Sequence, residues 1–375
     1  MAQPSRVFFT SMRTRKGDSI PKKLKRLIMA AGLQDLDVEG KFVAIKAHMG
    51  EAGNVSFLKP VYARTIADTV TELGGKPFVT DCSTLYPGLR SNAVDHAHCA
   101  ELNGFNSISC GCPVVIGDGL RGSDEVALPV PGQDSLLEEA YIGSAIVQAD
   151  VLISLSHTKG CTAAAYGGAI KNLGMGCASR AGKAVQHAEG VPAVKPDDCV
   201  GCGTCIPACG QHAISLVNRK AYIDDSCLGC GHCIAYCHRF AIRPTFTNNY
   251  ANLQLRMAEY AAALCASKPN QMLHIAIAID VTPQCDCFGD NDAPIVPNIG
   301  MFASTDPVAL DQAATDAICA APQVESSVLP ERHAAAPDGM NHLHAINPSS
   351  DWELQLAHAE ELGAGTRDYE LVEVR

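Results

Sequence analysis

The chain lacks long hydrophobic runs and an excess of basic residues. None of its apolar stretches approaches the roughly 18 residues that a membrane-spanning helix needs, and its start lacks the charged segment and apolar stretch of an export signal. Lysine and arginine number 29 against 40 aspartates and glutamates, a formal charge of −11, whereas nucleic-acid binding requires a basic surface. We therefore expect a cytoplasmic protein that binds neither membranes nor nucleic acid.

Aromatic and charged residues are scarce, at 5% and 18%, while hydrophobic residues make up 47%. This composition is typical of a globular protein and excludes a disordered chain, which has high charge and few apolar residues. The length of 375 residues suits two or three domains. Cysteine, by contrast, is abundant, with 18 residues. Because no export signal accompanies them, we expect metal ligands or free thiols in a reducing, anaerobic cytoplasm rather than disulfides.

Short apolar runs alternate with helical patterns along the chain. Residues 42–46 and 77–80 are apolar runs typical of strands. Between them lies a helical pattern that begins near Pro60 and ends at Gly74 and Gly75. This order of strand, helix and strand indicates a parallel sheet.

The same order recurs further along the chain. A helical pattern over 142–149 precedes an apolar run at 151–155, and a pattern over 253–264 precedes one at 273–279. A last apolar run follows at 299–303. We therefore expect an α/β fold with an open, mainly parallel sheet.

A cysteine-rich segment interrupts this α/β pattern, which resumes after it. The chain then continues to Asp306, a predicted helix cap, with Pro307 at the first helical position. The predicted domains are therefore one α/β domain in two parts, 1–192 and 247–375, with an inserted unit at 193–246. The alternative is a separate C-terminal domain from 247 onward.

The inserted unit contains two groups of four cysteines with the same spacing. Each group follows the pattern C-x2-C-x2-C-x3-C, and the second lies 28 residues after the first. The eight positions are Cys199, Cys202, Cys205, Cys209, Cys227, Cys230, Cys233 and Cys237. The repeat continues beyond the cysteines, because residues 212–214 recur as 240–242 at the same displacement. This duplicated spacing predicts two 4Fe-4S clusters in an α+β, bacterial ferredoxin-like domain.

The spacing also predicts how the cysteines divide between the clusters. Three thiolates on a tight loop bind three iron atoms of one cube, whereas the fourth cysteine lies a helical turn away and reaches the other cube. The predicted sets are Cys199, Cys202, Cys205 and Cys237 for one cluster, and Cys227, Cys230, Cys233 and Cys209 for the other. Zinc is the alternative metal. Gly210 and His238 stand where ferredoxins usually have proline, which affects loop packing and hence the reduction potential.

Three stretches of the larger domain resemble a known family. They are FVAIKAHMGE at 42–51, VLISLSHTKGCTAAAYGGAIKNLGMGC at 151–177 and FASTDPVALD at 302–311. Together they resemble the iron-sulfur proteins catalogued as domain of unknown function 362, which implies a fold but little chemistry. The pattern from His157 through Tyr166 to Lys171 is also similar to lactate racemase, although this segment is longer here. That similarity implies a catalytic histidine and a lysine that tethers a nickel cofactor.

Several residues follow predicted strand ends or a Gly-Gly turn, where open α/β sheets bind ligands. The candidate catalytic residues are His157, Lys171, His48 and Glu51, and the candidate cofactor-binding residues are Gly167 and Gly168. The alternative for His157 is a buried histidine with satisfied hydrogen bonds, and for Lys171 a local cap. For His48 and Glu51 the alternative is a solvated turn.

Other cysteines lie outside the inserted unit. Cys110 with Cys112 and Cys285 with Cys287 form two pairs in loops rich in glycine and aspartate. Together they form either a further metal site or ordinary reduced cysteines. Cys161 and Cys177 flank the candidate site and are either redox-active or small buried hydrophobes.

Two functions of different classes are consistent with these patterns. The first is an oxidoreductase in which the clusters pass electrons to a small-molecule substrate or cofactor near His48, His157 and Lys171. Its electron donor would be a ferredoxin, a flavodoxin or another redox protein, because no dinucleotide fingerprint follows residues 42–46. The second is a non-catalytic electron-transfer or cofactor-maturation protein that docks a partner redox enzyme.

Overall fold

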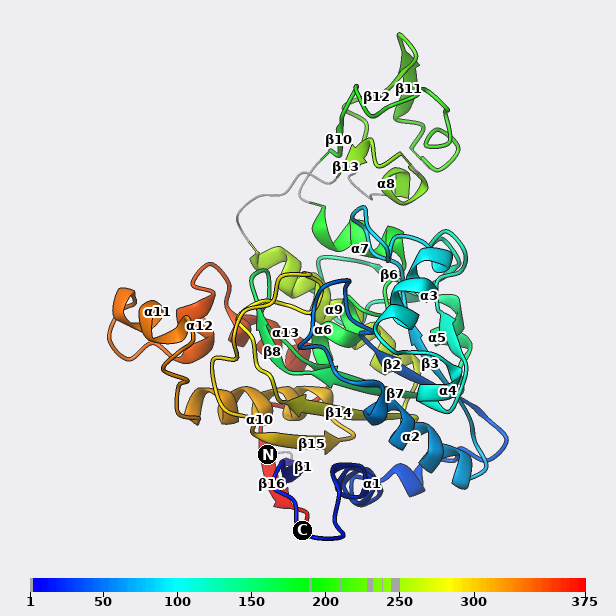
Figure 1. Cartoon of the computed structure of the whole chain (residues 1–375). Helices are drawn as coiled ribbons and strands as arrows, with labels where there is room; N and C mark the ends of the chain where they lie inside the picture. The colour runs from blue at the N-terminus through cyan, green and yellow to red at the C-terminus, as the bar shows by residue number, and fades with distance from the viewer. Residues whose placement is uncertain (1–2, 189–190, 210, 228–231, 238, 244–249) are drawn as a thin grey trace.

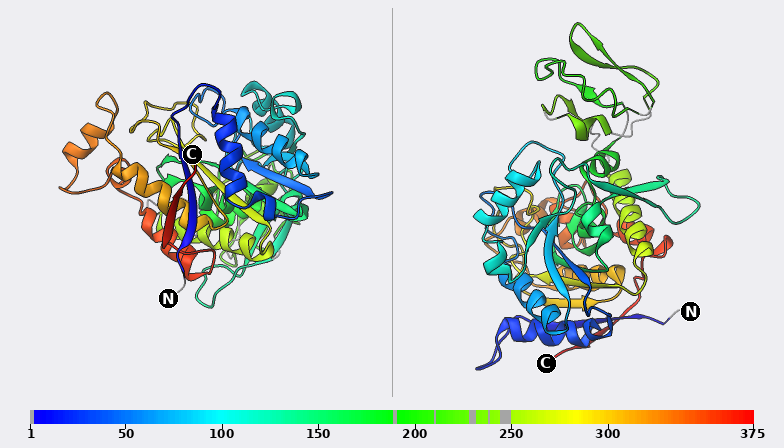
Figure 2. Two further views of the ribbon diagram at one scale, coloured as in Figure 1. Left: turned by 90° about the horizontal axis from the view of Figure 1, so that it is seen from below. Right: turned by 90° about the vertical axis from the view of Figure 1, so that its right-hand side faces the viewer.

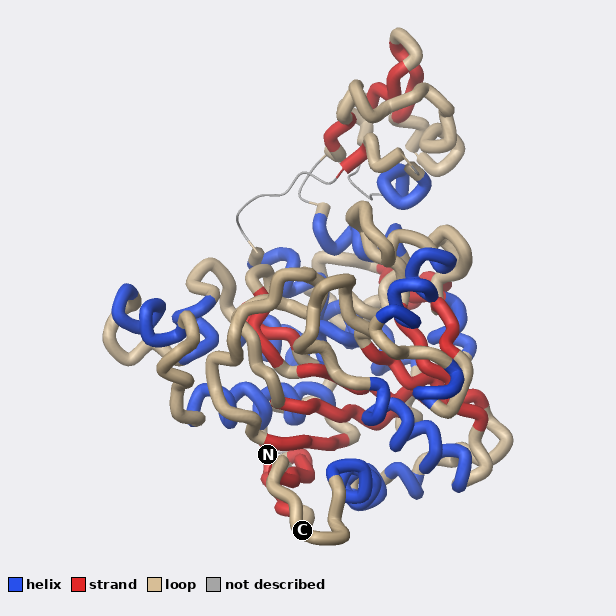
Figure 3. Tube along the Cα trace, viewed as in Figure 1, coloured by secondary structure: helices blue, strands red, loops and turns tan. Residues whose placement is uncertain are grey.

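The computed structural model describes the chain except residues 1–2, 189–190, 210, 228–231, 238 and 244–249. Its centre is an eight-stranded sheet in the order β16-β1-β15-β14-β7-β2-β3-β4 (Figure 1, Figure 3). The strands are β1 (Ser5–Ser11), β2 (Phe42–Ala47), β3 (Lys76–Asp81), β4 (Val114–Ile116), β7 (Val151–His157), β14 (Met272–Ala278), β15 (Gly300–Ser304) and β16 (Tyr369–Glu373). Two hairpins lie beside it, β5 (Glu125–Pro129) with β6 (Glu139–Gly143) and β8 (Lys159–Cys161) with β9 (Ala165–Gly167).

Most strands of the central sheet run in the same direction. The neighbours from β14 to β4 pair in parallel, as do β1 and β16. Among the described strands of this sheet, β15 alone runs the other way, antiparallel to both β14 and β1. The expected α/β class with a mainly parallel sheet is confirmed. The exception arises because the chain passes from β14 to β15 without a helix, whereas parallel neighbours usually need a helical crossover.

Helices cover both faces of the sheet (Figure 2). One core contains residues of α1 and α2, and the other contains residues of α6, α9, α10 and α13. Every residue of β7 and β14 is buried, and their side chains alternate between the two cores; Ile275 packs into the first and Ala276 into the second. A strand buried on both faces reads as a continuous apolar run, which is why the sequence identified these two strands.

The helices have the following bounds. They are α1 (Ile20–Ala30), α2 (Pro60–Glu72), α3 (Ala93–Leu102), α4 (Ser107–Cys110), α5 (Ser144–Gln148), α6 (Ala169–Gly174), α7 (Arg180–His187), α8 (His232–Tyr236), α9 (Ala251–Ser267), α10 (Pro307–Ala320), α11 (Leu329–Ala335), α12 (His342–Ile346) and α13 (Trp352–Glu361), with a short 3-10 helix at Leu33–Asp35. Within the described part of the chain, no helix is long and apolar enough to cross a membrane.

The predicted helices are largely confirmed. The Asp306 carboxylate accepts hydrogen bonds from the backbone N–H groups of Val308 and Ala309, each at 2.9 Å, so it caps α10 as expected. Helices α2 and α9 also form where their patterns predicted them. The helix expected over 142–149 is shorter, because Ile142 belongs to β6 and pairs with Val126 of β5.

A small unit lies between β7 and β14 in the sequence and beyond α7 in space (Figure 1, Figure 2). Its first strand, β10 (Ala193–Val194), pairs antiparallel with its last, β13 (Ile242–Arg243), which brings the two ends of the unit together. Strands β11 (Ile214–Val217) and β12 (Lys220–Ile223) form a hairpin within it. Because β7 and β14 are neighbours in one sheet, the unit is an insertion into the α/β fold. The predicted boundary at 246 and 247 lies outside the described residues.

Candidate active site

A cavity of about 530 Å³ lies at the carboxyl ends of β2, β3 and β7. The strand ends contribute Lys46, Asp81 and His157 to its wall. The inserted unit contributes Phe240 and Arg243. The cavity therefore occupies the edge of the sheet where open α/β folds bind ligands, and the inserted unit covers part of it.

Of the candidate residues, His48, His157, Lys171, Gly167 and Gly168 all line this cavity. Glu51 is not among its lining residues. Its carboxylate instead pairs with the guanidinium of Arg90 at 2.9 Å, and Arg90 lines the cavity. The right-handed crossovers of a parallel sheet bring successive strand ends to one edge, which is why residues over 100 positions apart meet here.

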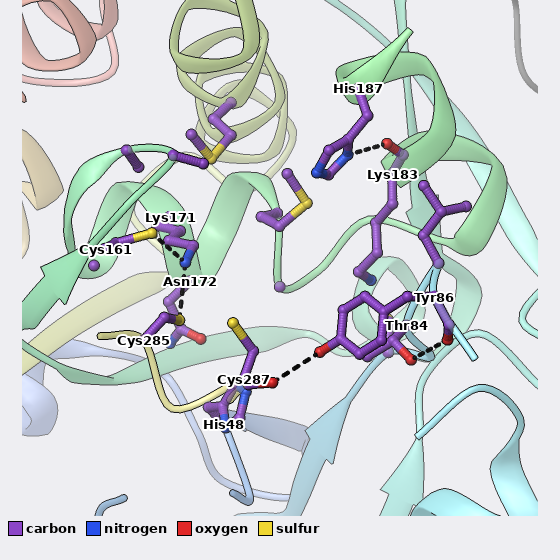
Figure 4. A pocket seen from close by; sticks show the side chains of 18 of the residues that line it. His48, Thr84, Tyr86, Cys161, Lys171, Asn172, Lys183, His187, Cys285 and Cys287 are labelled. Carbon is purple, nitrogen blue, oxygen red and sulfur yellow. Dashed lines mark hydrogen bonds between the residues drawn. The ribbon is translucent and has the colours of Figure 1, made fainter. Parts of the chain in front are cut away.

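Lys171 on α6 lies between two cysteine sulfurs (Figure 4). Its Nζ is 2.9 Å from Sγ of Cys161 and 3.0 Å from Sγ of Cys285. Burial alone lowers the pKa of Lys171, but the neighbouring sulfurs raise it, and the net direction is well above the ordinary value. Lys171 is therefore an ammonium ion, rather than the neutral amine that a base or a covalent anchor requires.

Cys285 is the thiol that this arrangement ionises. Hydrogen bonds from the Cys161 and Cys287 thiols are the largest cause, and with the positive charge of Lys171 they hold the pKa of Cys285 well below its ordinary value despite burial. The same contacts and burial raise the pKa values of Cys161 and Cys287. A thiolate is the nucleophilic form of cysteine, so the cavity wall contains one activated sulfur beside two protonated ones.

His157 has a structural partner on each ring nitrogen. Its Nδ1 is 2.9 Å from a carboxylate oxygen of Asp286, and its Nε2 donates to the carbonyl oxygen of Ile279 at 2.7 Å. The Nζ of Lys159 lies 3.0 Å from the same carboxylate. Burial raises the pKa of Asp286, but its contacts with His157 and Lys159 more than offset this, and the net direction is downward. Both ring contacts join His157 to the segment that follows β14.

His48 is a neutral imidazole. Burial is the largest cause, and with the Arg90 guanidinium, 3.0 Å from Nε2, it lowers the pKa of His48 to about 3. Its Nδ1 accepts a hydrogen bond from the N–H of Gly50 at 3.0 Å. A neutral histidine in the cavity wall can accept or donate a hydrogen bond but cannot bind an anion by charge.

The Gly167-Gly168 turn serves packing. A Cβ at Gly168 would lie 2.4 Å from a carboxylate oxygen of Asp311, and that carboxylate accepts hydrogen bonds from the first N–H groups of α6, those of Ala169 and Ile170. The close approach that glycine permits here is thus to Asp311. Burial raises the pKa of Asp311 to about 6.

Sequence reasoning missed several residues of the cavity wall. The buried Lys46 ammonium lies 2.9 Å from Asp81 and 2.8 Å from the side-chain oxygen of Asn172, which joins β2, β3 and α6. Asp81 ends β3 and could have been found by the rule that selected His48 and His157. Arg90 lies in a loop and had no such signal.

Five cysteines of the inserted unit lie in or against a small core that also contains Leu85 and Ala184 of the α/β domain, namely Cys199, Cys205, Cys209, Cys233 and Cys237. Four cysteines of the unit line one hollow, namely Cys199, Cys202, Cys205 and Cys237. Cys209, Cys227 and Cys233 are also described, whereas Cys230 and the positions of Gly210 and His238 lie outside the described residues. Within that part of the chain, no three His, Cys, Asp or Glu side chains are placed to bind one metal ion.

The two remaining cysteine pairs lie in different hydrophobic clusters. Cys110 and Cys112 pack with α2 in the first sheet core, while Cys285 packs with Cys161 and Met257 at the cavity. Cys110 and Cys112 therefore do not share a site with Cys285 and Cys287, which answers the question that the sequence left open. The partner of Cys285 is Cys161, which comes from β8.

Comparisons with known proteins concern the family and the fold. A family model described as "Domain of unknown function (DUF362)" matches residues 43–316. No curated protein matches the chain. The lactate racemase apoprotein from Thermoanaerobacterium thermosaccharolyticum is 11% identical, with a TM-score of 0.35 over 74% of this chain and 51% of that one. A protein from Thermotoga maritima is 9% identical, with a TM-score of 0.36 over 69% and 50%. The chain spans about half the length of these two structures.

Proposed function

The chain belongs to the family described as "Domain of unknown function (DUF362)", and we propose that it is an iron-sulfur oxidoreductase in which the inserted unit passes electrons to a substrate in the cavity. The observation that carries this proposal is the shared cavity wall. Ile234 and Phe240 line the cavity, and they stand next to Cys233 and close to Cys237 in the sequence. One short segment of the chain thus contains both predicted cluster ligands and residues of the cavity wall.

The cysteines of the inserted unit fit two 4Fe-4S clusters. The hollow lined by Cys199, Cys202, Cys205 and Cys237 has the membership that crossed ligation requires. A cube binds its thiolates through separate iron atoms, so these sulfurs are spaced more widely than the ligands of a single ion. When bound, such clusters accept and donate single electrons.

Backbone amides support the sulfurs in a repeated way. The N–H of Ala213 donates to Sγ of Cys209, and the N–H of Ala241 donates to Sγ of Cys237, both at 3.3 Å. These two pairs are related by the sequence repeat. Amide donors stabilise the negative charge of thiolate ligands and raise the reduction potential of what they bind. Each fourth cysteine therefore has the same local support, as two duplicated halves would provide.

The cavity favours an anionic substrate with an apolar part. Its buried cations Lys46, Arg90 and Lys159 each have a carboxylate partner. Lys171 contacts sulfurs, and Lys183 donates to the backbone carbonyl of Ala178. Because Lys171 is engaged by the cysteine sulfurs, the positive charge of Lys183 is the one available to a carboxylate or phosphate group.

The rest of the cavity wall is largely apolar. It includes Met175, Met257 and Leu253 from the α/β domain and Phe240 from the inserted unit. Such a surface excludes water and strengthens the electrostatic interactions within the cavity. A non-catalytic docking protein has no use for a cavity with buried cations, so the geometry favours the enzyme. We expect a ferredoxin, a flavodoxin or a similar protein to supply the electrons.

The proposal is tested by metal analysis of anaerobically purified protein. We expect about eight iron and eight sulfide per chain, as two cubes require. The Cys237→Ser variant should lose the cluster held by Cys199, Cys202 and Cys205, although it lies in the second group. The Cys319→Ser variant, in α10 far along the chain from these motifs, is the matched control and should keep all its iron. Zinc without sulfide would overturn the proposal.

A further inference from the structure

Two distant segments each bring cysteines to the same part of the cavity wall. Cys161 ends β8, and Cys285 and Cys287 lie in the loop after β14. Cys161 and Cys285 are each 3% exposed and contact the same ammonium, that of Lys171 (Figure 4). Their thiols are also within hydrogen-bonding reach of each other. Neither sequence segment alone indicates this pair.

The backbone holds the two segments close together. The N–H of Gly160 donates to the carbonyl oxygen of Thr282 at 2.8 Å. A Cβ at position 160 would lie only 2.4 Å from the carbonyl oxygen of Pro283, so a larger residue would force the segments apart. Gly160 lies one position before Cys161, and Pro283 lies two positions before Cys285. The approach of Cys161 to Cys285 is therefore built into the main chain.

Ionic contacts fix the same junction on its other side. The Asp286 carboxylate, adjacent to Cys285, pairs with both His157 and Lys159, which precede Cys161 on the other segment. All three side chains are buried. Because such a paired group cannot separate without exposing unpaired charges, the two cysteines keep their distance as the cavity fills and empties.

The ammonium of Lys171 indicates what chemistry these sulfurs perform. A positive charge 3.0 Å or less from both sulfurs stabilises a thiolate but repels a divalent cation. The arrangement is that of an activated thiolate with a second thiol beside it, which is the arrangement of a redox-active dithiol.

We propose that Cys161 and Cys285 form a redox-active dithiol and disulfide pair that receives the electrons of the inserted unit. This role rests on the proposed function for its electron source. Two single electrons from the reduced inserted unit and one proton convert the disulfide into the Cys161 thiol and the Cys285 thiolate. The pair thus collects one-electron deliveries into a two-electron reductant.

The oxidant that completes the cycle is a small-molecule disulfide with an anionic group. The Cys285 thiolate attacks one of its sulfurs, a mixed disulfide forms and the first thiolate leaves. The Cys161 thiol then gives its proton to the first departing thiolate, and its sulfur attacks the sulfur of Cys285, which releases the second thiolate and closes the Cys161–Cys285 disulfide. Lys183, in the same cavity, offers a positive charge to the anionic group.

Thiol mapping of the intact protein tests the pair directly. The anaerobic holoprotein is equilibrated with mixtures of reduced and oxidised glutathione, quenched in acid, alkylated and digested for mass spectrometry. We expect a peptide linked through Cys161 and Cys285 and the loss of two alkylatable thiols per chain. The link should be absent from Cys161→Ser and Cys285→Ser and unchanged in Cys319→Ser. A Cys285–Cys287 link, two free thiols throughout, or a metal ion lost in Cys285→Ser would overturn the pairing.

A second measurement separates this inference from the proposed function. The oxidised protein is reduced anaerobically by a photoreduced deazaflavin, a one-electron donor, and compared with the Cys199→Ser variant. We expect the disulfide to open at least ten times faster in the protein with all its iron. If the iron-sulfur absorbance bleaches while the disulfide persists, the proposed electron transfer from the clusters to the disulfide is wrong, whereas the presence of the clusters is supported. If the disulfide forms in a protein without iron and sulfide, the pair stands and the proposed function falls.

Discussion

Several residues of the cavity wall stabilise their neighbours through buried ion pairs, from which water is excluded. Asp286 shows this most clearly, because one buried carboxylate neutralises Lys159 and orients His157. Removing one partner of a buried ion pair is costly, because the remaining charge is left without compensation. The stability of the loop after β14 therefore depends on one side chain.

The Asp286→Asn variant tests this dependence. We expect a loss of about 3–5 kcal/mol in the free energy of unfolding, because the ammonium of Lys159 stays buried without its counter-charge. Denaturant unfolding under anaerobic conditions measures the loss. The Asp292→Asn variant is the matched control, since Asp292 is exposed in the same loop, and its stability should change by less than about 0.5 kcal/mol. Equal stability of the two variants would contradict the charge argument.

A second residue prediction concerns Lys171 and the reactivity of Cys285. Replacing Lys171 with Met keeps most of the side-chain volume but removes the positive charge, so the pKa of Cys285 should rise. We expect alkylation of Cys285 by iodoacetamide at pH 7 to slow about tenfold or more, because one pKa unit corresponds to a factor of about ten in thiolate. Peptide mass spectrometry follows the rate. Lys183→Met, in the same cavity, should leave the Cys285 rate within about twofold.

Local signals made some of these residues predictable and left others hidden. His48, His157 and Lys171 were found because each follows a strand end or a Gly-Gly turn, and the topology of a parallel sheet brings such positions together. Arg90, Cys161 and Cys285 take their roles from partners far away in the sequence. A single sequence does not show which distant residues meet. The contact between Cys161 and Cys285, and the presence of Arg90 rather than Glu51 in the cavity wall, could therefore be found only in the structure.

At the scale of elements, the start of α6 depends on a group from another helix. The Asp311 carboxylate of α10 accepts hydrogen bonds from the N–H groups of Ala169 and Ile170 and from the hydroxyl of Tyr166. This contact joins the helix that carries Lys171 to the helix after β15. Because the carboxylate is buried, the same contact introduces a pH dependence.

The pH dependence has a definite sign. Burial raises the pKa of Asp311 to about 6 from an ordinary 3.8, so the folded state binds a proton more tightly than the unfolded state. Asp311 therefore makes the free energy of unfolding fall as the pH rises from about 4 to about 6, by up to about 3 kcal/mol. Asp118, whose pKa burial also raises to about 6, contributes in the same direction.

The Asp311→Asn variant should lose part of this slope. Denaturant unfolding at pH 4, 5, 6 and 7 measures it in the variant and the parent protein. We expect the variant to gain stability relative to the parent protein as the pH rises from 4 to 7, by up to about 3 kcal/mol, because the amide of Asn cannot ionise and so avoids the cost of burying a charge. A variant with the full slope of the parent would contradict the assignment of the titration to Asp311.

The sequence predicted elements better than their directions. Strands β7 and β14 are continuous apolar runs, and α10 has its cap and proline in adjacent positions, so both kinds of element are defined locally. The reversal of β15 is not local, because it depends on how the chain crosses from β14 without a helix. Likewise Ile142 continues a helical pattern but joins β6, where pairing with β5 overrides periodicity.

At the scale of the whole molecule, the chain combines an α/β domain with an inserted unit whose two ends meet at the β10 and β13 pair. The sequence predicted a unit at 193–246 because the cysteine spacing and the strand pattern differ so strongly. The contact of the unit with the cavity was not visible, because Phe240 reaches Arg180 and the cavity wall only in the folded chain.

Through that contact the inserted unit forms part of the cavity wall. Ligand binding in the cavity is therefore thermodynamically linked to the packing of the unit against the α/β domain. Any molecule that fills the cavity touches both the α/β domain and four residues of the inserted unit, namely Ile234, Phe240, Ile242 and Arg243. It therefore favours the docked arrangement of the unit, and whatever orders the unit must, by reciprocity, tighten binding in the cavity by the same factor. A change that stabilises the folded inserted unit should therefore also increase the affinity of the cavity for its substrate, and the reverse should hold.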